Sequence, residues 1–250
     1  MMFRVMTRAL VAALALMATL VFAGEPVEQA LQDKLRAKLE VPAMGLKVES
    51  VTASELPGLY EVQFANGGPL VYATASGDHF LLGDLYQVGP EGYVNLAEQR
   101  RDGERKEKVD AIAEEDMIVF SPEGEPRAYI TVFTDVTCFY CQKLHREVPA
   151  LNKQGVEVRY LAYPRAGVDS DGYRQLASAW CADNPQDTLT KLKNKEAVTA
   201  KACDDNPIAQ QYLLGQQLGV RGTPAIITQS GQMIPGYQSA DELMVTLGLN

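Results

Sequence analysis

The chain has 250 residues, 46% of them hydrophobic, which is enough for one large or two small domains with buried cores and unlike a disordered protein. Its formal net charge is −9, and no cluster of basic residues interrupts the acidic balance. Composition therefore argues against a nucleic-acid-binding protein.

The first 23 residues have the layout of a secretory signal peptide. Arg4 and Arg8 precede an apolar run over residues 9–22, and Ala23 supplies a small residue for cleavage. The run is shorter than the roughly 20 residues that a membrane span needs, although a transmembrane anchor is the alternative. We predict cleavage after Ala23, export, and no stable membrane insertion. Loss of the two arginines takes the formal net charge from −9 to −11.

Residues 24–92 are predicted to form a small α+β domain. Val27, Leu31, Leu35 and Leu39 recur every four residues, which indicates an amphipathic helix that ends near Pro42. Strand-like runs follow at residues 46–51, 60–64, 70–74 and 79–82, with glycine-containing turns between them. A domain this small gains stability by self-association, and an exposed edge strand can continue the sheet into a second copy of the chain. We expect a homodimer; a monomeric packing domain is the alternative.

Residues 93–116 are predicted to form a linker helix. Acidic and basic residues alternate along it, which favours ion pairs between residues four apart on a solvated helix. Gly103 lies inside the segment and is a candidate for a bend.

Residues 117–250 alternate between strand-like and helix-like segments. A predicted edge strand at 117–120 and a strand at 129–135 precede a helix that starts at Cys138 and is disturbed by Pro149; a strand at 156–162 then completes a βαβ unit with a parallel pair. Helices are predicted at 173–182, 186–194 and 208–218, and strands at 225–228 and 233–237. A last helix starts at Ser239 with a capping box to Glu242. This order predicts an α/β domain with a helical insertion.

The chain has four cysteines, which in an oxidising compartment are expected to pair. Cys138 and Cys141 pair most readily by proximity, which leaves Cys181 with Cys203. A zinc site with four thiolates is the competing interpretation, but the 21 residues between Cys181 and Cys203 do not form a zinc knuckle.

Cys138 is the candidate nucleophile, because it lies where a strand ends and a helix begins. The unpaired N–H groups and the positive dipole end of that helix favour thiolate over thiol and lower the pKa of Cys138. Cys141, one turn further along, is the candidate resolving thiol. A purely structural local disulfide is the alternative.

Two further polar residues flank the dithiol. Asp135 is placed to relay a proton to the resolving thiol; a helix cap or a solvated carboxylate is the alternative. His145 lies four residues after Cys141 on the same helix face. We expect it to be an exposed surface histidine, and a residue that tunes the thiols is the alternative.

Several segments together resemble the DsbC-type protein disulfide isomerases, which have a thioredoxin-like catalytic domain. The segments are residues 133–145 around Cys138-Phe139-Tyr140-Cys141, residues 158–165, residues 218–225 around Thr223-Pro224, and residues 234–238. The resemblance runs from about Met117 to the C-terminus, and the N-terminal unit is similar in size and layout.

The resemblance implies a V-shaped periplasmic homodimer, joined through its N-terminal dimerisation domains, with two catalytic domains facing a cleft. It implies that Cys138 and Cys141 are the redox-active pair, that Cys181 and Cys203 form a structural disulfide, and that Pro224 is a cis-proline after Thr223, facing the dithiol and contacting substrate. A membrane electron donor of the DsbD type would keep the pair reduced, and misoxidised or unfolded proteins would be the clients. No cofactor or metal is expected.

The sequence departs from the family's usual pattern at Phe139, where glycine is common, and at Gln142, where histidine is common. These departures concern redox potential and client range, and leave the reaction type unchanged. Isomerisation is the predicted function. The alternatives are a DsbG-like reductase that protects single oxidised cysteines and a cysteine-independent holdase chaperone.

Overall fold

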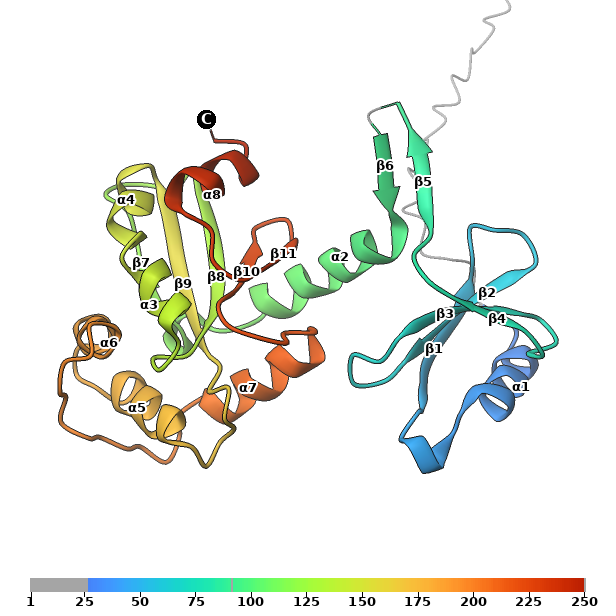
Figure 1. Cartoon of the computed structure of the whole chain (residues 1–250), viewed down its shortest axis with the longest axis horizontal. Coiled ribbons are helices and arrows are strands. Elements are labelled where there is room, and N and C mark those ends of the chain that lie inside the picture. The colour runs from blue at the N-terminus through green and yellow to red at the C-terminus, as the bar shows by residue number, and fades with distance from the viewer. Residues whose placement is uncertain (1–26, 91, 250) are drawn as a thin grey trace, which may run out of the picture.

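A computed structural model describes residues 27–90 and 92–249, so the predicted signal peptide at residues 1–23 lies outside the described residues. The described part holds two sheet-containing regions connected by one long helix (Figure 1). No helix within it is both long enough and apolar enough to span a bilayer.

The first region is an antiparallel sheet with one helix against it. Helix α1 (Gln29–Leu39) packs on the four-stranded sheet β1-β2-β3-β4, whose strands are Val48–Ala53, Leu59–Phe64, Leu70–Thr74 and Phe80–Leu82. Leu35, Val62 and Ala73 are fully buried in the core between helix and sheet. The predicted helix and all four strands are present, with small shifts of their ends.

A β-hairpin that the sequence analysis did not predict follows this sheet. Strands β5 (Tyr86–Gly89) and β6 (Gly92–Asn95) pair antiparallel, and β6 runs directly into the linker helix. The side chains of Tyr86, Val88 and Tyr93 are exposed. An isolated hairpin lacks the alternation between core and solvent that makes a strand visible in a sequence.

The linker helix α2 (Leu96–Asp110) starts at the Asn95 cap, whose side chain accepts from the amide of Glu98. It continues through Gly103 without a break. It is also less solvated than expected, because the Arg105 guanidinium is buried and donates to Glu98, Asp102 and the main-chain oxygen of Leu218. This arginine anchors α2 to the C-terminal region.

The C-terminal region has a five-stranded sheet in the order β11-β10-β8-β9-β7. Strands β8 (Ala128–Thr134) and β9 (Val156–Ala162) are central and parallel, as predicted, while β7 (Ile118–Phe120), β10 (Ala225–Thr228) and β11 (Met233–Pro235) run antiparallel to their neighbours. Seven of the helices belong to this half of the chain or lead into it: α2, α3 (Phe139–His145), α4 (Val148–Lys153), α5 (Asp171–Trp180), α6 (Pro185–Lys193), α7 (Ile208–Gln217) and α8 (Ala240–Thr246).

Both faces of this sheet are covered, so its central strands are mostly buried. The polar exceptions on β9 are Glu157 and Arg159, which pair with each other. Ile130 and Val132 of β8 point to a core shared with α3–α6 and α8, while Phe133 points to the opposite face, with Val109 of α2. The predicted break at Pro149 is present, since α3 and α4 are separate helices. The capping box of Ser239 and Glu242 at the start of α8 is confirmed.

Candidate active site

The two cysteines of the Cys-x-x-Cys segment lie at the end of β8, at the start of α3. Strand β8 is buried and ends at Thr134; a short turn over residues 135–137 then leads to Cys138, the N-cap residue of α3, with extended backbone angles. Both thiols are free and buried, with Cys138 3% and Cys141 1% exposed. The Cys138 sulfur therefore lies at the N-terminus of α3, and the Cys141 sulfur lies in its first turn.

The environment of Cys138 favours its thiolate. A hydrogen bond from Cys141, assisted by the Thr223 hydroxyl and the positive charge of Arg165, lowers the pKa of Cys138 to about 5 despite its burial. In the thiol form, Cys138 Sγ donates to the main-chain oxygen of Thr223 at 3.2 Å. In the thiolate form it can only accept, and the Thr223 hydroxyl, buried with no other partner among the described residues, has a free proton to donate.

Cys141 has the opposite environment. Burial, followed by the hydrogen bond that it shares with Cys138, raises the pKa of the Cys141 thiol, so this thiol is protonated when Cys138 is ionised. Two neighbouring sulfur atoms whose pKa values are pushed in opposite directions form a pair with one nucleophile and one reserve thiol.

The loop before β10 closes the site opposite α3. The Thr223–Pro224 peptide bond is cis, and the main-chain oxygen of Pro224 accepts from the amide of Gly236 in the next turn. Chain folding therefore brings Thr223 and Pro224, 85 residues away in sequence, into contact with Cys138.

The Asp135 carboxylate is buried and occupied by local hydrogen bonds. Its Oδ1 accepts from the amide and the hydroxyl of Thr137 at 2.8 and 2.7 Å, and its Oδ2 accepts from the amide of Arg165 at 2.9 Å. These bonds tie the turn before Cys138 to the segment after β9. They hold the turn and also keep the Arg165 charge beside the site.

The expectation that His145 is a surface residue is wrong. Its side chain is 6% exposed, because helix α6 covers this face of α3. Its Nδ1 lies 3.0 Å from the hydroxyl of Tyr160 and its Nε2 lies 3.0 Å from the hydroxyl of Thr190. Burial, together with the charge of Lys193, lowers the pKa of His145 to about 4, so the ring is neutral near pH 7.

The two residues between the cysteines are exposed. Phe139 is 61% and Tyr140 55% exposed, and their rings meet edge to face with centroids 5.4 Å apart. Gln142, by contrast, is buried and donates to the main-chain oxygen of Val136. The Phe139–Tyr140 pair therefore forms an apolar surface next to the thiols.

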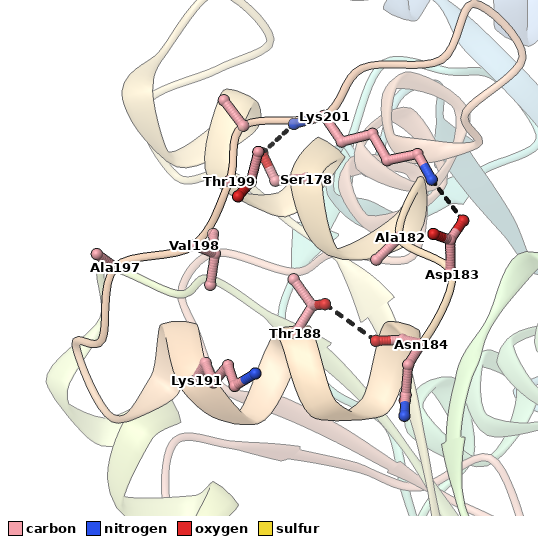
Figure 2. A pocket seen from close by; sticks show the side chains of 11 residues that line it. Ser178, Ala182, Asp183, Asn184, Thr188, Lys191, Ala197, Val198, Thr199 and Lys201 are labelled. Atoms are coloured by element: carbon pink, nitrogen blue, oxygen red, sulfur yellow. Dashed lines mark hydrogen bonds and ion pairs between the residues drawn. The ribbon is translucent and has the colours of Figure 1, made fainter.

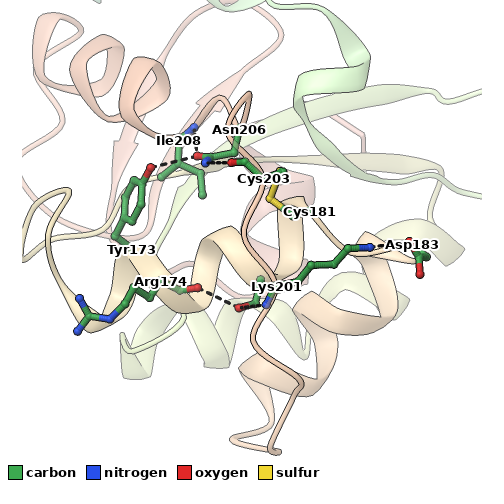
Figure 3. Close-up of a disulfide and its surroundings, with 9 residues drawn as sticks. Tyr173, Arg174, Cys181, Asp183, Lys201, Cys203, Asn206 and Ile208 are labelled. Carbon is green, nitrogen blue, oxygen red and sulfur yellow. Dashed lines mark hydrogen bonds and ion pairs between the residues drawn. A yellow bond between two sulfur atoms is a disulfide. The ribbon is translucent and has the colours of Figure 1, made fainter.

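The other two cysteines form a disulfide away from the site. Cys181, after α5, is bonded to Cys203 in the irregular segment between α6 and α7, where Asn206 donates to the main-chain oxygen of Cys203 (Figure 3). Within residues 27–90 and 92–249, no group of three or more His, Cys, Asp or Glu side chains is placed to bind a metal. The zinc interpretation would need all four sulfur atoms together, and the structure separates them into two pairs.

A pocket of about 490 Å³ lies beside this disulfide, between α5, α6 and the segment at 197–201. Lys201 crosses its rim to pair with Asp183, and Thr188 bonds back to Asn184 (Figure 2). None of its lining residues belongs to the dithiol site.

Comparisons with known proteins agree with this geometry. Residues 23–98 match the disulfide bond isomerase protein N-terminal domain, and residues 113–248 match a thioredoxin-like domain. The thiol:disulfide interchange protein DsbC of Escherichia coli K12 is 37% identical over 80% of this chain and 81% of its own length, and that of Haemophilus influenzae is 30% identical over 87% and 91%. The chain belongs to the DsbC family.

Solved structures resemble the catalytic part of this DsbC-family chain. A disulfide interchange protein from Neisseria gonorrhoeae is 27% identical, with a TM-score of 0.50 over 56% of this chain and 98% of that one. A linker-deletion mutant of ScsC from Proteus mirabilis has a TM-score of 0.52 over 61% of this chain and 83% of that one, but at 18% identity it supports the fold alone.

Two charged residues of the site were given no role from the sequence. Arg165 ends the segment 158–165, which carries part of the resemblance, and Lys193 ends a helix of the insertion and belongs to no motif. Lys193 is only 1% exposed. The apolar spacing of Leu189 and Leu192 identifies the buried face of α6, but a lysine next to that face looks like an ordinary polar helix end.

Proposed function

We propose that this chain is an exported thiol:disulfide interchange protein that reduces and reshuffles non-native disulfides in client proteins. The observation that supports this proposal most directly is the free Cys138 thiol at the start of α3. The pKa of this thiol is lowered to about 5, while that of Cys141 is raised. Membership of the DsbC family supports isomerisation as the overall reaction.

The proposed reaction has two exchange steps. The Cys138 thiolate attacks a client disulfide, forms a mixed disulfide with one client sulfur and releases the other as a thiolate. That thiolate can attack another disulfide of the client, which completes a rearrangement. Otherwise Cys141 attacks Cys138, the client leaves reduced and the Cys138–Cys141 disulfide forms.

The surrounding residues have proposed supporting roles. Thr223 and Pro224 form the wall of the site, on which an extended client segment would lie. The main-chain oxygen of Thr223 is free to pair with that segment once Cys138 is a thiolate. Asp135 holds the turn before Cys138 through Thr137 and Arg165, and the proton-relay role receives less support because its carboxylate bonds lead away from Cys141. The Cys181–Cys203 disulfide has a structural role and fastens the irregular segment after α6.

We also propose the domain division and assembly. The division is a signal peptide at 1–23, a dimerisation domain at 24–92, a linker at 93–116 and a catalytic domain at 117–250. The predicted linker helix is shorter than 93–116, because residues 92–95 form strand β6 and the helix α2 spans Leu96–Asp110. The apolar side chains of edge strand β4 and of the β5–β6 hairpin are exposed, with Leu82 at 70%, Val88 at 77% and Tyr93 at 79%, and self-association would bury them. Periplasmic location, a homodimer and a membrane electron donor of the DsbD type complete the proposal.

Reactivation of a scrambled multi-disulfide protein tests the function. Cys138→Ser should abolish reactivation, and Cys141→Ser should accumulate a client mixed disulfide. Full reactivation by the Cys138→Ser protein would overturn the mechanism. If single oxidised cysteines were reduced while scrambled disulfides were not reshuffled, the DsbG-like reductase would replace the isomerase.

A further inference from the structure

Lys193 is a buried cation that the proposed reaction leaves without a role. It is the last residue of α6 and 1% exposed, and its Nζ donates to the hydroxyl of Thr134 and, at 3.1 Å, to the main-chain oxygen of Asp135. Both partners lie in the segment that connects β8 to the dithiol. The ammonium group is therefore placed behind the active site, on the side away from solvent.

No carboxylate neutralises this charge among the described residues. The Asp135 carboxylate is the acidic group nearest in sequence to the two acceptors of Lys193, but it accepts hydrogen bonds from Thr137 and Arg165. A buried, unpaired ammonium is costly, so a protein that keeps one needs a nearby group that becomes negative.

The groups that face Lys193 come from three elements. Helix α3 contributes Cys141, Cys138 and the neutral ring of His145, strand β9 contributes Tyr160, whose ring centroid is 5.7 Å from Nζ, and the turn after β8 contributes Asp135. Burial raises the pKa of Tyr160, which stays protonated. The thiols are thus the groups that can supply a negative charge beside Lys193 during the reaction.

We propose that Lys193 is a positioning residue whose buried charge stabilises the Cys141 thiolate when Cys141 resolves the mixed disulfide at Cys138. The inference rests on the proposed function, because it assigns the second exchange step to Cys141. It concerns that step; the first attack by Cys138 depends less on this charge, because Cys141 interacts with Lys193 more strongly than Cys138 does.

The step balances as follows. The Cys141 thiol gives up its proton, and its sulfur forms a bond with Cys138 Sγ while the bond between Cys138 and the client sulfur breaks. The bonding electron pair leaves with the client sulfur, and the departing client thiolate takes up the proton. Over both exchange steps the Cys138–Cys141 pair loses two electrons and the two sulfur atoms of the client disulfide gain them. Lys193 carries the opposite charge while the Cys141 sulfur is negative.

The charge interactions in the site have the asymmetry that this role needs. The Lys193 charge is the largest influence that lowers the pKa of Cys141, which burial raises. Conversely, burial lowers the pKa of Lys193, and the negative charge of Cys141 is the largest influence that opposes it. Cys138 also acts on Lys193, but less than Cys141 does, and Arg165 is the cation that lowers the pKa of Cys138. Lys193 therefore acts mainly on Cys141.

Lys193→Met tests the inference, because methionine fills a similar volume without charge. Lys191→Met is the matched control on the same helix, since Lys191 is exposed and pairs with Asp187. A mixed disulfide between Cys138 and glutathione is formed on the full chain, and the release of glutathione is followed from pH 5 to 10. The Cys138 alkylation profile is measured in parallel.

Removing a nearby charge shifts a thiol pKa by about 1–3 units. Each unit lowers the thiolate fraction tenfold and raises its nucleophilicity about threefold, so release should slow about 3- to 30-fold at neutral pH. We expect the pH midpoint of release to rise in Lys193→Met and not in Lys191→Met, with a smaller rise in the midpoint of Cys138 alkylation. Release at the wild-type rate and midpoint would overturn the inference.

A measurement on the unaltered protein covers the case in which Lys193→Met fails to fold. The Lys193 side chain is titrated by its ε-carbon chemical shift in the reduced and oxidised proteins. We expect a lower pKa in the oxidised protein, which has no thiolate; equal values in both states would contradict the inference. The Cys141→Ser trap separates the two hypotheses: if no mixed disulfide accumulates there, the proposed function itself fails.

Discussion

The Cys138 thiol donates a hydrogen bond of 3.2 Å to the main-chain oxygen of Thr223, the residue before the cis-proline. This bond joins the start of α3 to the loop before β10, so the nucleophile and the wall of the site are held in one arrangement. When Cys138 ionises, that oxygen loses its donor and becomes free to accept from a client backbone amide. Activation of the sulfur and exposure of a client-binding group are thereby coupled.

The first prediction concerns the pH dependence of Cys138. Its alkylation rate should rise with pH around a midpoint near 5, the value to which the pKa of Cys138 is lowered. In Cys141→Ala, which removes the largest cause of this shift, the midpoint should move upward. A wild-type midpoint in the ordinary thiol range, near 9, would contradict the assigned environment.

The same shift predicts the stability of the reduced protein. Between about pH 5 and 9 the unfolded chain binds a proton at Cys138 that the folded protein does not, so stability should rise with pH across this window and be lost as pH falls through 5. Urea unfolding of the reduced protein at several pH values measures this. Cys138→Ser is the control, and it should lack the slope above about pH 6.5, where His145 no longer contributes.

His145 should make stability depend on pH over a different window. Thr190 donates its hydroxyl proton to the main-chain oxygen of Gln186, so His145 Nε2 must be the donor to Thr190, and Nδ1 accepts from Tyr160. The pKa of His145, lowered from 6.5 to about 4 by burial, then means that the unfolded state binds more protons between these values.

Stability should therefore fall as pH decreases from about 6.5 to 4, by about 3 kcal/mol at about 1.4 kcal/mol for each pKa unit. The measurement is urea unfolding of the oxidised protein, in which Cys138 does not titrate. His145→Gln should remove most of this slope, whereas His79→Gln, which changes an exposed histidine, should keep it. An unchanged slope in His145→Gln would contradict the neutral buried ring.

Gly231 fixes the contact between the linker helix and the catalytic sheet. Its φ is +90°, and a Cβ added there would lie 1.8 Å from the main-chain oxygen of Asp102 in α2. Gly231→Ala should therefore lower the free energy of unfolding by about 2–4 kcal/mol, through backbone strain and displacement of α2. Gly222→Ala, with open space around the added atom, is the control and should change it by less than about 1 kcal/mol. Equal effects in a thermal unfolding experiment would show that this contact is not tight.

Phe139 should affect clients more than stability. Because its ring is 61% exposed, Phe139→Ala should change the free energy of unfolding by less than about 0.5 kcal/mol. Exchange with peptides that carry apolar residues next to cysteine should slow, since the Phe139–Tyr140 surface loses half of its aromatic area, while exchange with glutathione should not. Phe139→Leu should retain most of the peptide rate. Equal slowing for both substrates would point instead to a change in the thiols themselves.

Much of the fold was accessible from the sequence because its strands and helices have strong local patterns. Strand β9, rich in β-branched and aromatic residues, and the capping box of Ser239 were predicted at their observed positions. The β5–β6 hairpin was not predicted, because its apolar side chains are exposed and show no alternation between buried and exposed positions. The dithiol was recognisable because its two cysteines are close together in the sequence.

The rest of the site depends on contacts between distant segments. His145, Arg165 and Lys193 come from three parts of the chain, and only packing of α6 against α3 makes one of them a buried neutral ring and another a buried cation. A polar residue at a helix end has the same local pattern whether it faces water or a thiol. Tertiary structure decides which.

The redox state of Cys138 and Cys141 in the native compartment tests the central claim most directly. Cells are quenched in acid, free thiols are alkylated with a mass tag, and the Cys181–Cys203 disulfide, expected to stay oxidised, serves as the internal reference. The account predicts that Cys138 and Cys141 are mostly reduced, because only a reduced thiolate can attack a wrong disulfide. A pair found mostly oxidised would contradict it and identify the protein as a donor of disulfides.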